Sequence, residues 1–161
     1  MALRSFGVDV FAKDIDLASE TVKYITGEES WEKRPKAKRE WTTSLAEEAA
    51  KQFKEASNDH DVVIGDAPGR ITEITRIISR EASHSIICCR YDCKNEIGEW
   101  QVLFGSLKKE LIVIVTSKLS GTGSMSVNGI IRATVIGLNR KPKSDGIVRA
   151  IAWQIKLRLK I

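Results

Sequence analysis

The chain has 161 residues, of which 42% are hydrophobic and 29% charged, and its net charge is +5. This composition is typical of a globular protein with a sizeable core, and the longest apolar run, Leu111–Val115, is far shorter than the roughly 20 residues of a membrane-spanning helix. The first seven residues lack the apolar stretch of a secretory signal, and three cysteines are an odd number for disulfides. We therefore expect one domain over residues 1–161 in the cytoplasm or nucleus, or in a virion assembled there, and not a secreted protein.

The first half of the chain predicts helices. An extended arm is expected over residues 1–12, followed by a helical part over residues 13–82. Ser44 and Glu47 have the spacing of a capping box, which marks the start of one of these helices. The expected helices, each with apolar residues three or four positions apart, cover residues 14–26, 45–57 and 70–82, with a short strand over 62–64 before the third.

A basic loop is expected between the first two helices, over residues 28–40. Two tryptophans flank a run of cations in this loop. Such a run can neutralise phosphates or serve as a nuclear-localisation segment, and the tryptophans can stack on bases. The alternative is a solvated linker whose tryptophans anchor its ends. The residues of this second basic loop are Trp31, Lys33, Arg34, Lys36, Lys38, Arg39 and Trp41.

The second half predicts a β-sheet over residues 83–161. Its last stretch, Ile151–Ile161, alternates apolar and polar residues, a period of two that is typical of a half-buried strand. The expected strands cover residues 84–93, 99–106, 110–119, 125–138 and 151–161. The fold class that follows is α+β, with about three N-terminal helices packed on a mostly antiparallel, five-stranded C-terminal sheet.

Positive charge is concentrated in the last quarter of the chain. Residues 121–161 contain eight Lys or Arg and one Asp, a net charge of +7. In a strand, Lys156, Arg158 and Lys160 would form a row with a spacing of about 6.6 Å. We interpret this row, extended by cations of the preceding strand and loop, as an anion- or nucleic-acid-binding face; the alternative is that edge lysines prevent strand-to-strand aggregation. The candidate residues are Arg132, Arg140, Lys141, Lys143, Lys156, Arg158 and Lys160.

Other patterns favour ordinary structural roles. His84, Cys88, Cys89 and Cys93 do not have zinc-ligand spacing, because neighbouring cysteines of a strand point to opposite faces. His60 lies between two aspartates in a turn without an identifiable nucleophile. The sequence therefore predicts no metal site, no cofactor and no catalytic residues, and an enzyme is the least favoured class.

In size, charge and the order of helices before sheet, the chain resembles the small matrix proteins of plant-infecting rhabdoviruses. The resemblance covers the whole chain in these bulk features and transfers no functional residue. It implies a protein that condenses a nucleocapsid, self-associates and contacts an envelope. Our first hypothesis is accordingly a structural, self-associating assembly protein that binds an anionic nucleoprotein, RNA or membrane face, as a homo-oligomer without a transmembrane segment. The alternative is a free RNA-binding module, such as a silencing suppressor or regulatory factor.

Overall fold

The computed structural model describes residues 2–14, 41–67, 69–137 and 145–161. These residues form two compact units, Asp9–Glu81 on the one hand and Met1–Val8 with Ala82–Ile161 on the other. We call them the small unit and the large unit and describe each by itself. The expectation of a single domain stays a prediction.

The small unit contains two parallel strands and two helices. Strand β1 (Val10–Asp14) pairs with β2 (Val62–Asp66), and α2 (Thr43–Ala56) precedes β2 in the chain. Helix α2 forms because its small and aromatic residues recur on one face, where Ala46, Ala50 and Phe53 are buried. The short helix α3 (Glu73–Ser79) packs against α2 and buries Ile77 and Ile78.

Predicted elements of this unit are found with shifted ends. The two helices expected over residues 45–57 and 70–82 correspond to α2 and α3, and the expected short strand is β2. The cap of α2 is Thr42, whose hydroxyl accepts a hydrogen bond from the Leu45 amide, and not Ser44. The expected arm is not a free extension, since β1 pairs with β2 and residues Arg4–Phe6 form the 3₁₀ turn η1. The expected helix over residues 14–26 lies almost wholly outside the described residues.

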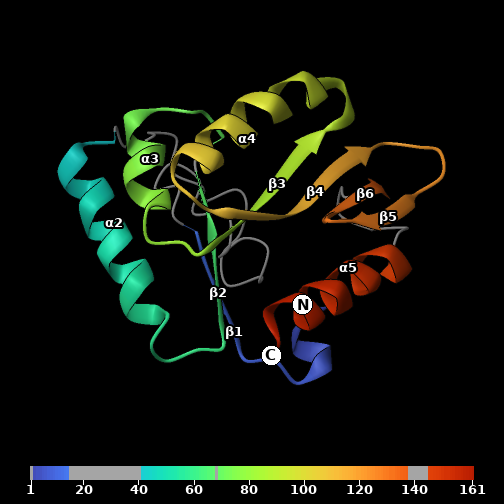
Figure 1. The fold of residues 1–161 in the computed structure, drawn as a ribbon, viewed down its shortest axis with the longest axis horizontal. Helices are drawn as coiled ribbons and strands as arrows, with labels where there is room; N and C mark the ends of the chain where they lie inside the picture. The colour runs from blue at the N-terminus through green and yellow to red at the C-terminus, as the bar shows by residue number, and fades with distance from the viewer. Residues whose placement is uncertain (1, 15–40, 68, 138–144) are drawn as a thin grey trace, which may run out of the picture. The chain divides into compact units, whose positions relative to one another are not determined.

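The large unit is built on a mixed four-stranded sheet with the order β3-β4-β6-β5 (Figure 1). Strand β4 (Glu110–Lys118) lies between β3 (His84–Arg90) and β6 (Ile130–Ile136) and is parallel to both. The edge strand β5 (Ser124–Asn128) is antiparallel to β6. The prediction of a mostly antiparallel sheet was therefore wrong.

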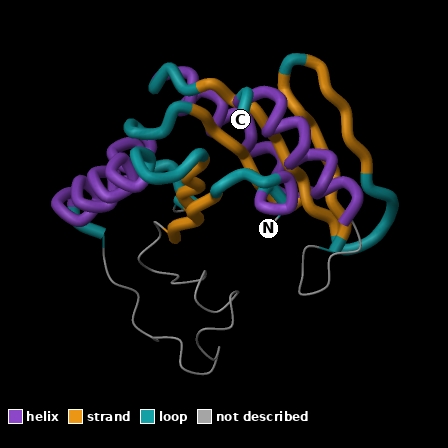
Figure 2. The backbone as a smooth tube through the Cα atoms, turned by 90° about the horizontal axis from the view of Figure 1, so that it is seen from below, coloured by secondary structure: helices purple, strands orange, loops and turns teal. Residues whose placement is uncertain are grey.

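Two helices of the large unit cover opposite faces of this sheet. Helix α4 (Ile97–Ser106), which follows the 3₁₀ segment η3 (Tyr91–Glu96), contacts β3 and β4, whereas α5 (Asp145–Leu159) contacts β5 and β6. Figures 1 and 2 show α4 and α5 on opposite sides of the strands. The prediction that all helices precede the sheet was thus wrong.

Burial along the strands agrees with this arrangement. Paired residues of neighbouring strands share a face, so Ile87, Ile114 and Arg132 point to one side of the sheet. On that side Ile87 and Ile114 are buried, whereas Arg132 is exposed. Helix α4 therefore covers only the β3–β4 half of this face, and α5 covers the β5–β6 half of the other.

The expected strand over residues 99–106 is helix α4. Trp100, Leu103, Phe104 and Leu107 follow the helical spacing of three and four, which the sequence reading missed, and the rings of Trp100 and Phe104 lie 5.8 Å apart. A helix is also required here, because two adjacent parallel strands need a crossover connection. The expected strand over residues 125–138 is the hairpin of β5 and β6, which turns at Gly129 with φ +69°.

The expected last strand over residues 151–161 is helix α5. Ile151, Ala152 and Ile155 are buried at helical spacing, while Trp153 and Leu157 are 44% and 54% exposed. The segment alternates apolar and polar residues because α5 has apolar residues on two sides, one that faces the core and one that faces solvent. Positions 155 and 157, which a strand would place on one face, have opposite environments.

This difference gives a direct test of the helix. Ile155→Ala should lower the free energy of unfolding by about 2–5 kcal/mol, because it leaves a hole in the core. Leu157→Ala, the matched surface change, should stay within about 0.5 kcal/mol of the parent. Urea denaturation followed by circular dichroism measures both, and equal losses would contradict the helix.

Candidate anion-binding site

The predicted basic row does not exist, because Lys156, Arg158 and Lys160 lie in and just after a helix. Lys156 donates a hydrogen bond from Nζ to the carbonyl oxygen of Phe6 at 2.7 Å. Arg158 donates from Nε to Oε1 of Glu110 at 3.1 Å. Lys160 follows the helix with a left-handed φ of +57°. Two of the three cations thus make contacts within the large unit, and the three are not aligned along a strand; their role in anion binding stays a prediction.

Several other predicted site residues lie outside the described residues. These are Trp31, Lys33, Arg34, Lys36, Lys38 and Arg39 of the second basic loop, and Arg140, Lys141 and Lys143 of the loop before α5. Trp41 is described and half-buried, and its indole nitrogen is buried without a hydrogen-bond partner in the described structure.

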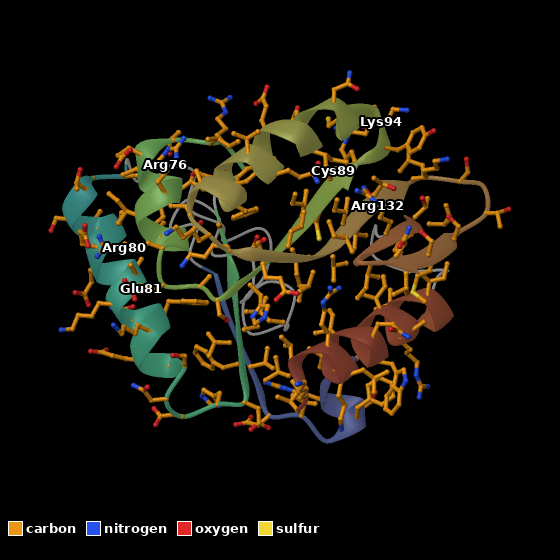
Figure 3. All side chains as sticks on the ribbon, viewed as in Figure 1. Arg76, Arg80, Glu81, Cys89, Lys94 and Arg132 are labelled. Carbon is orange, nitrogen blue, oxygen red and sulfur yellow. The ribbon has the colours of Figure 1, made fainter. Side chains whose placement is uncertain are left out.

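Of the predicted anion-binding residues, Arg132 lies in the sheet, on β6 between β4 and β5. It lies exposed on β6, paired with Ile114 of β4 and Ser126 of β5. Within the described residues, no carboxylate forms an ion pair with Arg132. Figure 3 labels Arg132 together with Lys94 and Cys89, which come from η3 and β3.

Hydroxyl groups surround Arg132 on the same face. Thr116 and Thr134 are paired across β4 and β6, with their hydroxyl oxygens 3.2 Å apart. Ser126 is paired with Arg132, and Ser124 with Thr134. These side chains offer hydrogen-bond donors beside a cation, and Ile130 and Ile136 lie on the same face at the two ends of β6.

Lys118, at the end of β4, extends this face to an aromatic ring. It lies on the same side of β4 as Thr116, and its ammonium nitrogen is 3.8 Å from the ring centroid of Tyr91. The ammonium nitrogen of Lys94 is 4.9 Å from the same centroid. Tyr91, which is 43% exposed, therefore attracts two like charges to one place through cation–π contacts.

Asp92, the residue after Tyr91, forms an ion pair with Arg90. Asp92 is bonded by the guanidinium of Arg90, whose Nε lies 3.0 Å from Oδ1. This contact holds the pKa of Asp92 below its ordinary value, chiefly through the hydrogen bond. In the described structure neither Lys94 nor Lys118 forms an ion pair with a carboxylate.

We define the cation–hydroxyl face as Tyr91, Lys94, Thr116, Lys118, Ser124, Ser126, Arg132 and Thr134. Strand geometry puts the Cα atoms of Lys118 and Arg132 about 14 Å apart, four residues along and one strand across. The Tyr91 end lies where parallel strands β3 and β4 end, and open sheets with parallel strands bind ligands beyond such carboxyl ends. The sequence analysis did not predict Tyr91, Lys94 and Lys118 as site residues. Predicting them would have required the parallel pairing of β3 and β4 and the residues at which these strands end.

The cysteines are free thiols. Cys88 is exposed on one face of β3, and Cys89 is partly buried on the other. Burial raises the pKa of Cys89, and the nearby Cys93 and Glu96 raise it further. Among the described residues no group of three or more His, Cys, Asp or Glu is arranged to hold a metal ion.

The histidines make local contacts. His60 Nδ1 lies 2.8 Å from Oδ2 of Asp9, and its ring stacks on Phe11 at 5.0 Å. In the large unit, Ser83 Oγ lies 2.8 Å from Nδ1 of His84, whose Nε2 is 3.7 Å from Glu110. That serine–histidine–glutamate order has the composition of a hydrolytic triad. However, Glu110 is shared with Arg158, and neither of two cavities, of about 650 and 210 Å³, is lined by Ser83 or His84.

Comparison with known proteins adds no relative: no family model, no curated protein and no solved structure matches this chain. In the described part of the chain, no helix is long and apolar enough to cross a membrane.

The role of Arg90 can be tested by NMR titration. The pKa of Asp92 should lie below its ordinary value and should rise in Arg90→Gln, which removes the hydrogen bond. Because the folded-state pKa is lowered, the contact stabilises the fold above the ordinary carboxyl pKa and is lost as the pH falls through the folded value. An unchanged Asp92 titration in Arg90→Gln would show that the ion pair is absent in solution.

Proposed function

We propose that the protein is a non-enzymatic binding module that holds single-stranded RNA on the cation–hydroxyl face. The observation that carries the proposal is the pair of ammonium groups at Tyr91, 3.8 and 4.9 Å from its centroid, without an ion-paired carboxylate in the described structure. Two cations at one ring make the potential there positive, and a bound phosphate would be attracted by both.

The rest of the face suits a chain of phosphates and sugars better than a single small anion. Arg132 provides a second cationic point, separated from Lys118 by serine and threonine hydroxyls. Hydroxyls can donate to phosphate oxygens and can both donate to and accept from the ribose 2′-hydroxyl. The face is also open along β5 and β6, where Ser126 and Arg132 are exposed.

The hypothesis of a self-associating assembly protein stays a prediction, but its structural premises have changed. The long terminal strand is a helix, and the N-terminal segment is not a free arm, because Phe6 is held by Lys156. The order of helices before sheet, on which the resemblance to rhabdovirus matrix proteins partly depended, is not the order observed. These corrections favour the RNA-binding alternative for the proposal.

Salt dependence tests the number of phosphate contacts. If Lys94, Lys118 and Arg132 each neutralise one phosphate, the logarithm of the affinity for an unstructured RNA should fall against the logarithm of salt with a slope of about −2. Lys118→Gln and Arg132→Gln should each reduce that slope by about 0.7. Fluorescence anisotropy with a labelled oligouridine measures this.

The matched control is Lys51→Gln, which removes one exposed cation of α2 in the small unit. It should leave the slope unchanged. If Lys51→Gln weakens binding as much as Lys118→Gln, the binding reflects net charge and not the cation–hydroxyl face.

The ring of Tyr91 is tested separately. Tyr91→Leu should weaken RNA binding about two- to fivefold, because it removes cation–π contacts that hold the two ammonium groups, each worth roughly 0.5–1 kcal/mol at an exposed position. Tyr91→Phe keeps the ring and should bind like the parent. Equal losses in both variants would assign the effect to the phenolic hydroxyl instead.

A further inference from the structure

Helix α5 has an apolar stripe that faces away from the core. Trp153 and Leu157 are four residues apart in α5, which places them on one side, and Ile161 follows two residues after the end of the helix. They are 44%, 54% and 36% exposed, although all are large apolar residues. Ile161 lies just beyond the helix: Lys160 has a left-handed φ of +57°, and the Ile161 amide donates to the carbonyl oxygen of Lys156, a bond that closes the end of α5. We call these three residues the outer stripe.

The outer stripe is backed by the rest of the large unit. The ring of Phe6 in η1 lies 5.3 Å from that of Trp153 at 59°, a tilted aromatic contact. Lys156 bonds the carbonyl oxygen of Phe6 and fixes η1 beside the helix. The Phe6 ring therefore packs against one side of the indole, while 44% of Trp153 stays exposed to solvent.

Cations border the outer stripe. Arg149 precedes Trp153 by four residues in α5 and its guanidinium carbon lies 6.0 Å from the ring centroid of Phe6, whereas Lys160 follows the end of the helix. Both are exposed, and residues 146–161 contain no Asp or Glu. The other two cations of this segment, Lys156 and Arg158, are engaged within the unit.

We propose that the outer stripe of α5 docks the protein on an anionic lipid surface. A helix that lies in a membrane interface combines tryptophan and leucine on one side with lysine or arginine at its border. Tryptophan suits the headgroup level because its ring has an apolar body and a polar N–H. A second copy of the chain fits less well, since a symmetric contact between two outer stripes would bring Arg149 and Lys160 of both copies together.

This inference is independent of the proposed RNA binding. The outer stripe is on α5, which covers the β5–β6 half of one sheet face, whereas Arg132 lies on the opposite face. The same protein can therefore be tested for both activities with separate variants. Lys118→Gln and Arg132→Gln serve as the cation–hydroxyl controls in a lipid experiment.

The experiment is co-sedimentation of the full chain with phosphatidylserine–phosphatidylcholine vesicles and with phosphatidylcholine vesicles. The parent should bind the anionic vesicles and not the neutral ones. Leu157→Gln should lower the partition coefficient roughly tenfold, because it removes an apolar side chain that enters the interface. Val127→Gln, which changes a residue of equal exposure (52%) on β5, should bind like the parent.

Three results would overturn the proposal. One is the absence of binding to anionic vesicles. Another is binding that Lys118→Gln or Arg132→Gln abolishes while Leu157→Gln keeps it, which would assign lipid binding to the cation–hydroxyl face. The third is a dimer, detected by light scattering without lipid, that Leu157→Gln converts to a monomer. Circular dichroism melting curves of each variant exclude unfolding as the cause, and Ile161→Gln provides a second change on the outer stripe.

Discussion

Burial of strand β4 on both faces is the constraint on which the large unit depends. Residues Ile112–Val115 are all at most 9% exposed, so each face of this strand needs its own cover. Helix α4 provides it on one side and α5 on the other, and because each helix is narrower than the sheet, each leaves half of a face open. The cation–hydroxyl face combines the open part of one sheet face on β5 and β6 with the end of β4 and with Tyr91 and Lys94 of η3.

The sequence was sufficient for elements whose signal is local. Helix α2 and strand β4 were found because a small-residue face and a continuous apolar run have few alternatives. It failed for α5, because apolar residues on two sides of a helix imitate the period of a strand. It also failed for the strand order, because the parallel pairing of β3 with β4 depends on contacts between residues far apart in the sequence. The helical spacing of Trp100 and Phe104 could have predicted the helix that connects these two strands.

The strand that was to align part of the candidate site was mispredicted for the same physical reason, and the binding role of its residues stays a prediction. Cations were grouped by their nearness in the sequence, but a helix turns Lys156 and Arg158 toward different partners, Phe6 and Glu110. Tyr91, Lys118 and Arg132 come from three elements; the Lys118 ammonium contacts the Tyr91 ring, and Arg132 lies on the same sheet face only through the register of β4 and β6. That the net charge indicates an anionic partner stays a prediction, and net charge cannot say which cations remain available to bind one.

The hydrogen bond from Lys156 to Phe6 joins residues 150 positions apart, and it has a consequence for synthesis on the ribosome. Proteins rich in contacts between distant residues fold slowly, because a long loop must close before those contacts form. The large unit cannot receive α5 until the last quarter of the chain has been translated, and η1 has no place to dock before then. During elongation the apolar β4 would therefore stay uncovered on one side, so the nascent chain should depend on chaperones until α5 has been synthesised.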